Sequence, residues 1–202
     1  GKNKYSFHPE FRVEQGIGRY GVYEELIRNF NTTSNRTSYS THRSALYPPL
    51  YYQLALPVIQ SVGKSDILTR LFVSRLTSVF LTSLLVVVAY MIGLEIFRKQ
   101  SWALTLSTMT LFYPMTTYIG SGFNSDNLHN LLFAVSTLLA IKLIYHGYTP
   151  RLSLLIGTVI GLDILTKPQA YILFPFFALA IIIRWRWDEW KKILVNALYV
   201  LG

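Results

Sequence analysis

Long apolar runs fill the chain from residue 67 onwards, whereas polar and aromatic residues dominate the part before it. A helix needs about 20 mainly apolar residues to cross the hydrocarbon core of a bilayer. The apolar stretch from 152 to 183 is too long for one such helix, and the polar residues Thr166-Lys167-Pro168-Gln169 interrupt it. The pattern therefore predicts five spans and the start of a sixth after Lys192, the five covering residues 68–97, 102–119, 127–145, 152–166 and 168–183.

Residues 1–66 predict an external loop that folds on the membrane surface. Residues 17–30 carry apolar side chains at helical spacing, which indicates a short amphipathic helix. Residues 46–59 include two adjacent prolines near their start, so Pro48 or Pro49 would begin a second interfacial helix. We expect an all-α polytopic membrane protein, a helical bundle (67–202) with an extracytoplasmic loop (1–66) that carries short interfacial helices.

Lysine and arginine in the short loops predict the orientation of the bundle. Short cytoplasmic loops are rich in Lys and Arg, whereas long segments are translocated largely regardless of their charge. Basic residues follow the first, third and fifth predicted spans, at 98–99, at 151 and at 184–192. These loops are expected in the cytoplasm. Residues 1–66, the loop 120–126 and Lys167 are then expected on the outer side.

Composition supports a membrane location. The chain of 202 residues is 51% hydrophobic and 14% charged, against about 25% charged in soluble domains. Its net charge of +9 would suggest nucleic acid in a soluble protein, but the apolar runs exclude that class and make the bilayer the expected partner. There is no cysteine, which excludes disulfides and thiolate metal sites. The chain lacks a starting Met and ends inside an apolar run, which predicts a fragment; a complete small membrane protein is the alternative.

Three polar features are candidates for chemistry. The run YPPLYY at 47–52 is either an interfacial aromatic anchor or a substrate-lining segment. Asp126 follows a long uncharged stretch at a helix start, so it either caps that helix or faces an outer cavity. Asp163 and Lys167 are four residues apart, which on one helix predicts a side-chain pair. That pair either neutralises itself or, beside the break at Pro168, forms a phosphate pocket.

These features, in this order, resemble the C-type superfamily of membrane glycosyltransferases (GT-C). The pattern is similar to protein O-mannosyltransferase-like and aminoarabinose-transferase-like enzymes. The resemblance covers residues 40–183. Its boxes are YPPLYYQLALPVI at 47–59, RLFVSRLTSVFLTSLLVVVAYMIGLEIF at 70–97, SGFNSDNLHNLLFAVSTLLA at 121–140 and GTVIGLDILTKPQAYILFP at 157–175.

The resemblance implies transfer of a sugar from a polyprenyl-phosphate donor to a protein, lipid or glycan acceptor at the outer membrane face. It implies integral, multi-pass localisation, in the plasma membrane of a prokaryote or the endoplasmic reticulum of a eukaryote. Some branches of the superfamily use a divalent metal such as Mg or Mn. The superfamily's catalytic Asp pair is missing here, so the carboxylate lies upstream of Gly1 or is replaced by Glu10 or Glu14.

The remaining site residues follow from the matching boxes and from charge. The substrate-binding residues that the resemblance implies are Tyr47, Pro48, Pro49, Tyr51, Tyr52, Asn124, Asp126, Asp163 and Lys167. A lipid phosphate needs cations at the membrane boundary, and the candidates are Arg43, Arg70, Arg75 and Lys167. The competing class is a non-enzymatic membrane protein, either a transporter half or an assembly subunit, which can also place ionisable residues within its spans.

Overall fold

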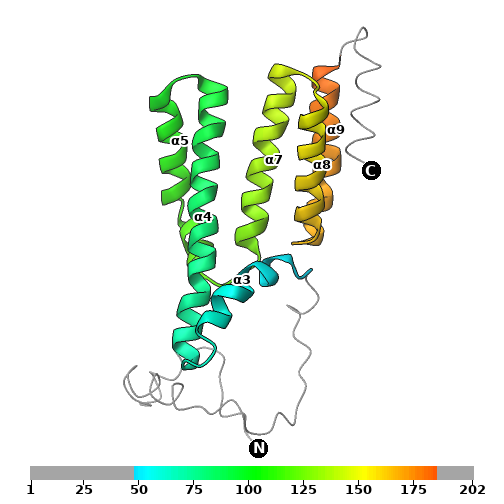
Figure 1. Cartoon of the computed structure of the whole chain (residues 1–202). Helices are drawn as coiled ribbons and strands as arrows, with labels where there is room; N and C mark the ends of the chain where they lie inside the picture. Colours follow the sequence, from blue (N-terminus) through cyan, green and yellow to red (C-terminus); the bar gives the residue numbers. More distant parts are fainter. Residues whose placement is uncertain (1–47, 186–202) are drawn as a thin grey trace, which may run out of the picture.

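The computed structural model describes residues 48–185, and every regular element in that part of the chain is helical (Figure 1). This confirms the all-helical expectation for the described residues. In chain order the helices are α3 (Leu50–Ser61), α4 (Ile67–Phe97), α5 (Gln100–Phe112), α6 (Pro114–Ser121), α7 (Asp126–His146), α8 (Pro150–Ile164), the 3-10 helix η2 (Pro168–Ile172) and α9 (Leu173–Arg184).

The long helices run side by side, and α7 lies at the centre of the bundle (Figure 1). It packs against α4 on one side and against α8 and α9 on the other, and α5 packs on α4. Most of the buried core comes from α7, α8 and α9. Helix α3 crosses obliquely beneath the end of the bundle where α7 begins and α8 ends, which we call the Lys167 end (Figure 1).

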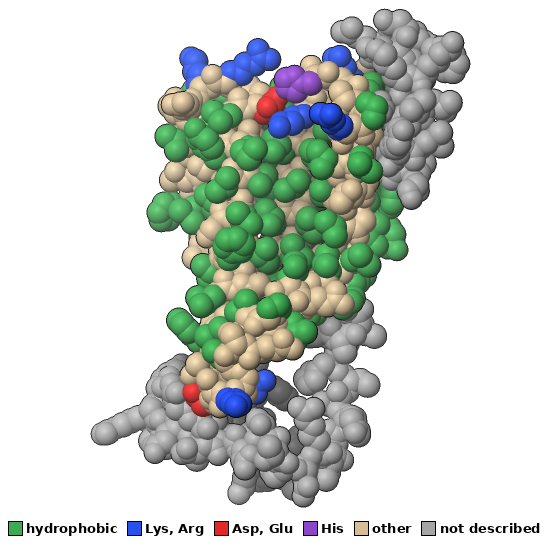
Figure 2. Space-filling model, in the orientation of Figure 1, with side chains coloured by type: hydrophobic (Ala, Val, Ile, Leu, Met, Phe, Trp, Pro, Cys, Tyr) green, Lys and Arg blue, Asp and Glu red, His purple; other side chains and the backbone are tan. Residues whose placement is uncertain are grey.

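Two helices, α4 and α7, are long and apolar enough to cross a membrane. Their 31 and 21 residues correspond to about 46 Å and about 31 Å at 1.5 Å per residue. Only 17% of the apolar window of α4 and 39% of that of α7 are buried. Their remaining apolar surface faces outward, as part of a hydrophobic belt between charged ends (Figure 2). The predicted helices 68–97 and 127–145 are thus confirmed as helices.

The single helix predicted over 102–119 is wrong. The chain forms α5 up to Phe112, leaves the helical conformation at Tyr113 and begins α6 at Pro114. Proline has no N–H for the helical ladder and disfavours the α conformation in the residue before it. Tyr113 is accordingly extended, with φ −66° and ψ 119°.

The predicted interruption between 166 and 168 is confirmed. Helix α8 ends at Ile164, Lys167 is extended with φ −151° and ψ 140°, and Pro168 opens η2, which leads into α9. Helix α3 starts later than the predicted 46–59 because Pro49 occupies its N-cap. Its first residue, Leu50, donates its N–H to the carbonyl oxygen of Leu165 at 3.2 Å, which fixes α3 beside the end of α8.

Helices α4 and α5 approach very closely at Gly93. A Cβ atom added to Gly93 would lie 2.6 Å from the Cα atom of Ala103 and 3.1 Å from its Cβ atom. Ala103 is fully buried in this contact. Small residues allow helix backbones to approach one another, which is the usual packing mode of helices in membranes.

Candidate functional site

A cavity of about 630 Å³ lies at the Lys167 end of the bundle. Five parts of the fold form it: α3, the first part of α4, the end of α6, the loop between α6 and α7 with the start of α7, and the turn at Lys167. Its lining residues are Tyr52, Arg75, Tyr118, Ile119, Ser121, Gly122, Phe123, Asn124, Ser125, Asp126 and Lys167.

Asn127 holds the end of α6 and the loop after it, which together carry most of this lining. Its side-chain amide lies 3.1 Å from the carbonyl oxygens of Ile119, Gly122 and Asn124, to which it donates. Its own side-chain oxygen accepts from the hydroxyl of Thr82 on α4 at 3.1 Å. Asn127 is buried, so these bonds are shielded from water. The loop is therefore fixed to α4, and the start of α7 is fixed with it.

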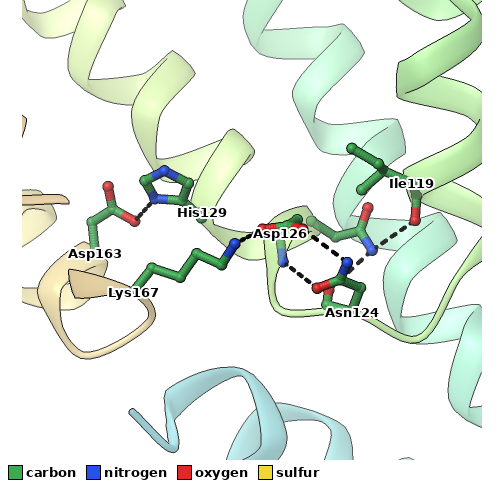
Figure 3. Close-up of polar contacts among 7 residues, drawn as sticks. Ile119, Asn124, Asp126, His129, Asp163 and Lys167 are labelled. Atoms are coloured by element: carbon green, nitrogen blue, oxygen red, sulfur yellow. Dashed lines mark hydrogen bonds and ion pairs between the residues drawn. The ribbon is translucent and has the colours of Figure 1, made fainter. Parts of the chain in front are cut away.

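Asp126 is the first residue of α7, and its carboxylate points toward the turn after α8 (Figure 3). One carboxylate oxygen accepts from the side-chain amide of Asn124 at 2.8 Å, and the other forms an ion pair with Lys167. The residue before it, Ser125, occupies the N-cap position, and its side chain makes no capping bond. Two positions were predicted for Asp126, at a helix cap or facing a cavity. In the structure Ser125 is the N-cap, and Asp126 lines the cavity.

The predicted side-chain pair between Asp163 and Lys167 is wrong. Their four-residue spacing would bring them together only on a continuous helix. Helix α8 ends at Ile164 and Lys167 is extended, so the lysine side chain points toward α7 instead. The two residues are joined through the backbone, where the N–H of Lys167 donates to the carbonyl oxygen of Asp163 at 2.8 Å.

Asp163 pairs with His129, which the sequence analysis did not identify. Atom Nδ1 of His129 lies 2.8 Å from one carboxylate oxygen of Asp163 (Figure 3). Asp163 is fully buried, and its second carboxylate oxygen has no hydrogen-bond partner. His129 follows Asp126 by three residues, so both lie on one face of α7 and connect that face to the α8 turn. That spacing is the signal in the sequence from which His129 could have been found.

Lys167 is largely enclosed, with 13% of its side chain exposed, against 27% for Asp126. Burial lowers the pKa of the Lys167 ammonium group from its usual value of 10.5. The Asp126 carboxylate supplies the opposite charge that such a buried cation needs. A second cation, Arg75, lines the same cavity, is exposed, and makes no hydrogen bond or ion pair with any described residue.

Three aromatic rings form the α3 side of the site. The ring centroids of Tyr51 and Tyr52 lie 5.1 Å and 5.9 Å from that of Phe123. Tyr51 is fully buried, and its hydroxyl lies 2.7 Å from the hydroxyl of Ser78 on α4. Burial raises the pKa of Tyr51. Tyr51 is thus part of the core, whereas Tyr52 reaches the cavity.

The cavity brings together some of the predicted site residues and leaves others apart. Pro48 and Pro49 precede α3, and Arg70 lies on α4, but none of them lines the cavity. Glu10, Glu14, Arg43 and Tyr47 lie outside the described residues. The predicted residues that do line it are Tyr52, Arg75, Asn124, Asp126 and Lys167.

The described residues do not fit a Mg or Mn site. Such ions take several oxygen ligands, usually including carboxylates. No group of three or more His, Asp and Glu side chains with metal-ligand spacing exists among residues 48–185. Among residues 48–185, Asp126 is the only carboxylate in the cavity lining, and an ammonium group binds it.

Comparison with known proteins places the chain in one family. No curated protein and no solved structure matches it. A family model described as "Predicted membrane protein (DUF2142)" matches residues 17–202, which includes the whole described bundle and cavity. The apolar belt and the two helices long enough to cross a bilayer agree with that description. The chain belongs to the DUF2142 family of membrane proteins.

Proposed function

We propose that this chain is part of a polytopic membrane glycosyltransferase of the GT-C type. It moves a sugar from a polyprenyl-phosphate carrier to a protein, lipid or glycan acceptor at the outer face of the membrane. The observation that carries the proposal is the cavity at the Lys167 end, where two cations and one carboxylate lie beside apolar helices. A lipid-linked phosphate needs this combination, since its head is anionic and its tail is apolar.

In this proposal the bundle crosses the bilayer, with the hydrophobic belt of Figure 2 against the lipid. Soluble proteins rarely expose apolar patches of more than a few hundred Å². Here large apolar side chains are exposed on α4, α5, α8 and α9, for example Phe80, Met109 and Leu154. The cavity then opens at the boundary between the hydrocarbon and the headgroups, at the depth of a lipid phosphate.

The reaction breaks the bond between the anomeric carbon and the phosphate oxygen of the carrier. A bond forms between that carbon and an acceptor oxygen, whose proton passes to a base. The bonding electrons leave with the phosphate, which Lys167 and Arg75 stabilise as charge develops on it. Both carboxylate oxygens of Asp126 have partners, so Asp126 is not assigned the role of this base. Glu10 and Glu14 are the proposed bases within this chain.

Transfer of labelled sugar tests the proposal. The full chain is reconstituted in lipid nanodiscs with a panel of polyprenyl-phosphate sugars, and released polyprenyl phosphate and glycosylated acceptor are measured. We expect turnover with at least one donor and a loss of about tenfold or more in Lys167→Gln, because a charge-assisted contact is worth about 1.5–3 kcal/mol. The control is Glu95→Gln, which removes a charge paired with His146 at the opposite end of the bundle.

Two results would overturn the proposal. One is the absence of sugar transfer from every donor, combined with movement of a labelled carrier across vesicle membranes, which would indicate a transporter. The other is equal loss of activity in Lys167→Gln and Glu95→Gln, which would mean that any charge removal disturbs the bundle.

A further inference from the structure

We propose that Asp126 is an internal competitor for the anion site at Lys167, so that a phosphate-bearing ligand binds only by displacing the Asp126 carboxylate from the lysine. The lipid form of this ligand rests on the proposed function. The competition itself requires only a phosphate group. The inference assigns Asp126 a role that lowers affinity, opposite to that of an ordinary substrate-binding residue.

The first observation is where the carboxylate lies. Asp126 and Lys167 come from segments 41 residues apart, and both line the cavity. The lysine side chain is only 13% exposed, and the carboxylate is bound to its ammonium group. A carboxylate oxygen and a phosphate oxygen make the same kind of charge-assisted contact with ammonium. An anion that enters the cavity therefore competes with the Asp126 carboxylate for the Lys167 ammonium group.

The second observation is that Asp126 can leave at little cost. Its side chain is 27% exposed and borders the cavity, and its other oxygen is bound by Asn124, an exposed loop residue. A displaced carboxylate would keep that bond and gain water. The Asp163 carboxylate lacks this freedom, because it is fully buried against His129. Of the two carboxylates near the turn, only Asp126 is free to exchange.

The third observation is that the lysine is held in place when the ion pair opens. The Lys167 N–H donates to the Asp163 carbonyl oxygen at 2.8 Å, and the Lys167 carbonyl oxygen accepts from the N–H of Ala170 at 3.1 Å. Asp163 is tied to α7 through His129, independently of Asp126. The turn thus has a second connection to α7, and the ammonium group stays at the cavity after Asp126 moves.

Arg75 makes the competition favourable to a phosphate. It lines the same cavity and has no partner among the described residues. The Asp126 carboxylate pairs with Lys167 but not with Arg75, whereas a phosphate has enough oxygen atoms to contact both cations. Movement of Asp126 away from Lys167 therefore lets one phosphate contact both cations.

Binding to the Asp126→Asn variant tests the inference. Asparagine can still accept the Asn124 bond and suits a helix start about as well as aspartate. The matched control is Asp66→Asn, which removes the same charge at the same end, at the N-cap of α4 and outside the cavity lining. Affinities for polyprenyl phosphate in nanodiscs and for inorganic phosphate in detergent are measured separately, with Lys167→Gln as the variant without the ammonium group.

We expect Asp126→Asn to bind polyprenyl phosphate about tenfold more tightly, which corresponds to about 1.4 kcal/mol. Asp66→Asn should stay within about twofold of the parent chain, since Asp66 does not line the cavity and its carboxylate is bound to Thr69 at the start of α4. Lys167→Gln should bind more weakly, and adding Asp126→Asn to it should give no gain. Tighter binding of inorganic phosphate as well would support recognition of the phosphate group itself. Tighter binding of polyprenyl phosphate alone would support a lipid ligand.

Equal or weaker binding of polyprenyl phosphate and of inorganic phosphate by Asp126→Asn, at an unchanged unfolding midpoint, would overturn the inference. Asp126→Ser serves as a second variant should the asparagine variant unfold. Sugar transfer measured on the same samples separates this inference from the proposed function. Tighter binding without transfer from any donor would refute the function alone, and transfer without tighter binding would refute the competition alone.

Discussion

Substitution of Gly93 by alanine tests the packing of α4 against α5. The added methyl group would lie 2.6 Å from the Cα atom of Ala103, which belongs to the backbone of a helix and cannot rotate away. The two helices must therefore separate. Forcing a methyl group into a packed contact costs about 1–3 kcal/mol. The better helix propensity of alanine returns at most about 1 kcal/mol. Because the clash is with helix backbone, the cost should lie in the upper half of its range, and subtracting the gain leaves a net loss of stability of about 1–2 kcal/mol.

The same substitution at Gly161 is the control. Gly161 lies within α8, and an added Cβ atom there meets no atom within 4 Å. Alanine should stabilise the helix by about 0.5–1 kcal/mol. The unfolding midpoints of both variants are measured by heating in mild detergent, where 1 kcal/mol shifts the midpoint by about 2–4 °C in a chain of this size.

A second-site variant sharpens the test. Ala103→Gly removes the contact at 3.1 Å but leaves the shorter one to the backbone, so it should not rescue Gly93→Ala. A Gly93→Ala midpoint at or above that of the parent chain would refute the close approach of α4 and α5. Full rescue by Ala103→Gly would show that the clash involves the side chain only.

Three further outcomes follow from the structure. Tyr51→Phe leaves the Ser78 hydroxyl buried without its partner and should destabilise the fold by about 1–3 kcal/mol in heat unfolding, and adding Ser78→Ala should recover part of that loss. Because burial lowers the pKa of Lys167, phosphate binding titrated between pH 7.5 and 10.5 should weaken as the pH rises through a value below 10.5. Lys167→Arg should abolish that alkaline loss of binding, and the same alkaline loss in Lys167→Arg as in the parent chain would contradict the prediction. Cysteines introduced at Ser121 and Gln100 should react with an impermeant reagent from opposite sides of the membrane, and labelling from the same side would contradict the proposed topology.

Local features of the fold could be predicted from the sequence. The long helices over 68–97 and 127–145 and the break before Pro168 depend on apolar run length and on proline, which act within a few residues. Pro114 breaks its helix by the same local rule, although it lies within a charge-free run that apolar length alone predicts as one helix. Proline interrupts a helix whether or not its neighbours are apolar.

The contacts at the site depend on distant parts of the chain and could not be predicted in the same way. Lys167 meets Asp126 across 41 residues, and His129 meets Asp163 across 34. The four-residue rule suggested a local partner for Lys167, but that rule holds only where the helix continues. The direction of the chain after Ile164 decides which carboxylate the lysine contacts. That direction cannot be predicted from the spacing of two residues in the sequence.

The unequal lengths of the helices have a consequence for the surrounding lipid in the proposed transmembrane arrangement. Helix α8 has 15 residues, or about 22 Å, and is shorter than the hydrocarbon core of about 30 Å, whereas α4 exceeds it. Bilayers adapt to short helices by local thinning, a response called hydrophobic mismatch. The membrane beside α8 should therefore be thinner than beside α4. Lipid headgroups there would approach the level of the turn after α8, so a carrier could present its phosphate at that turn without leaving the bilayer.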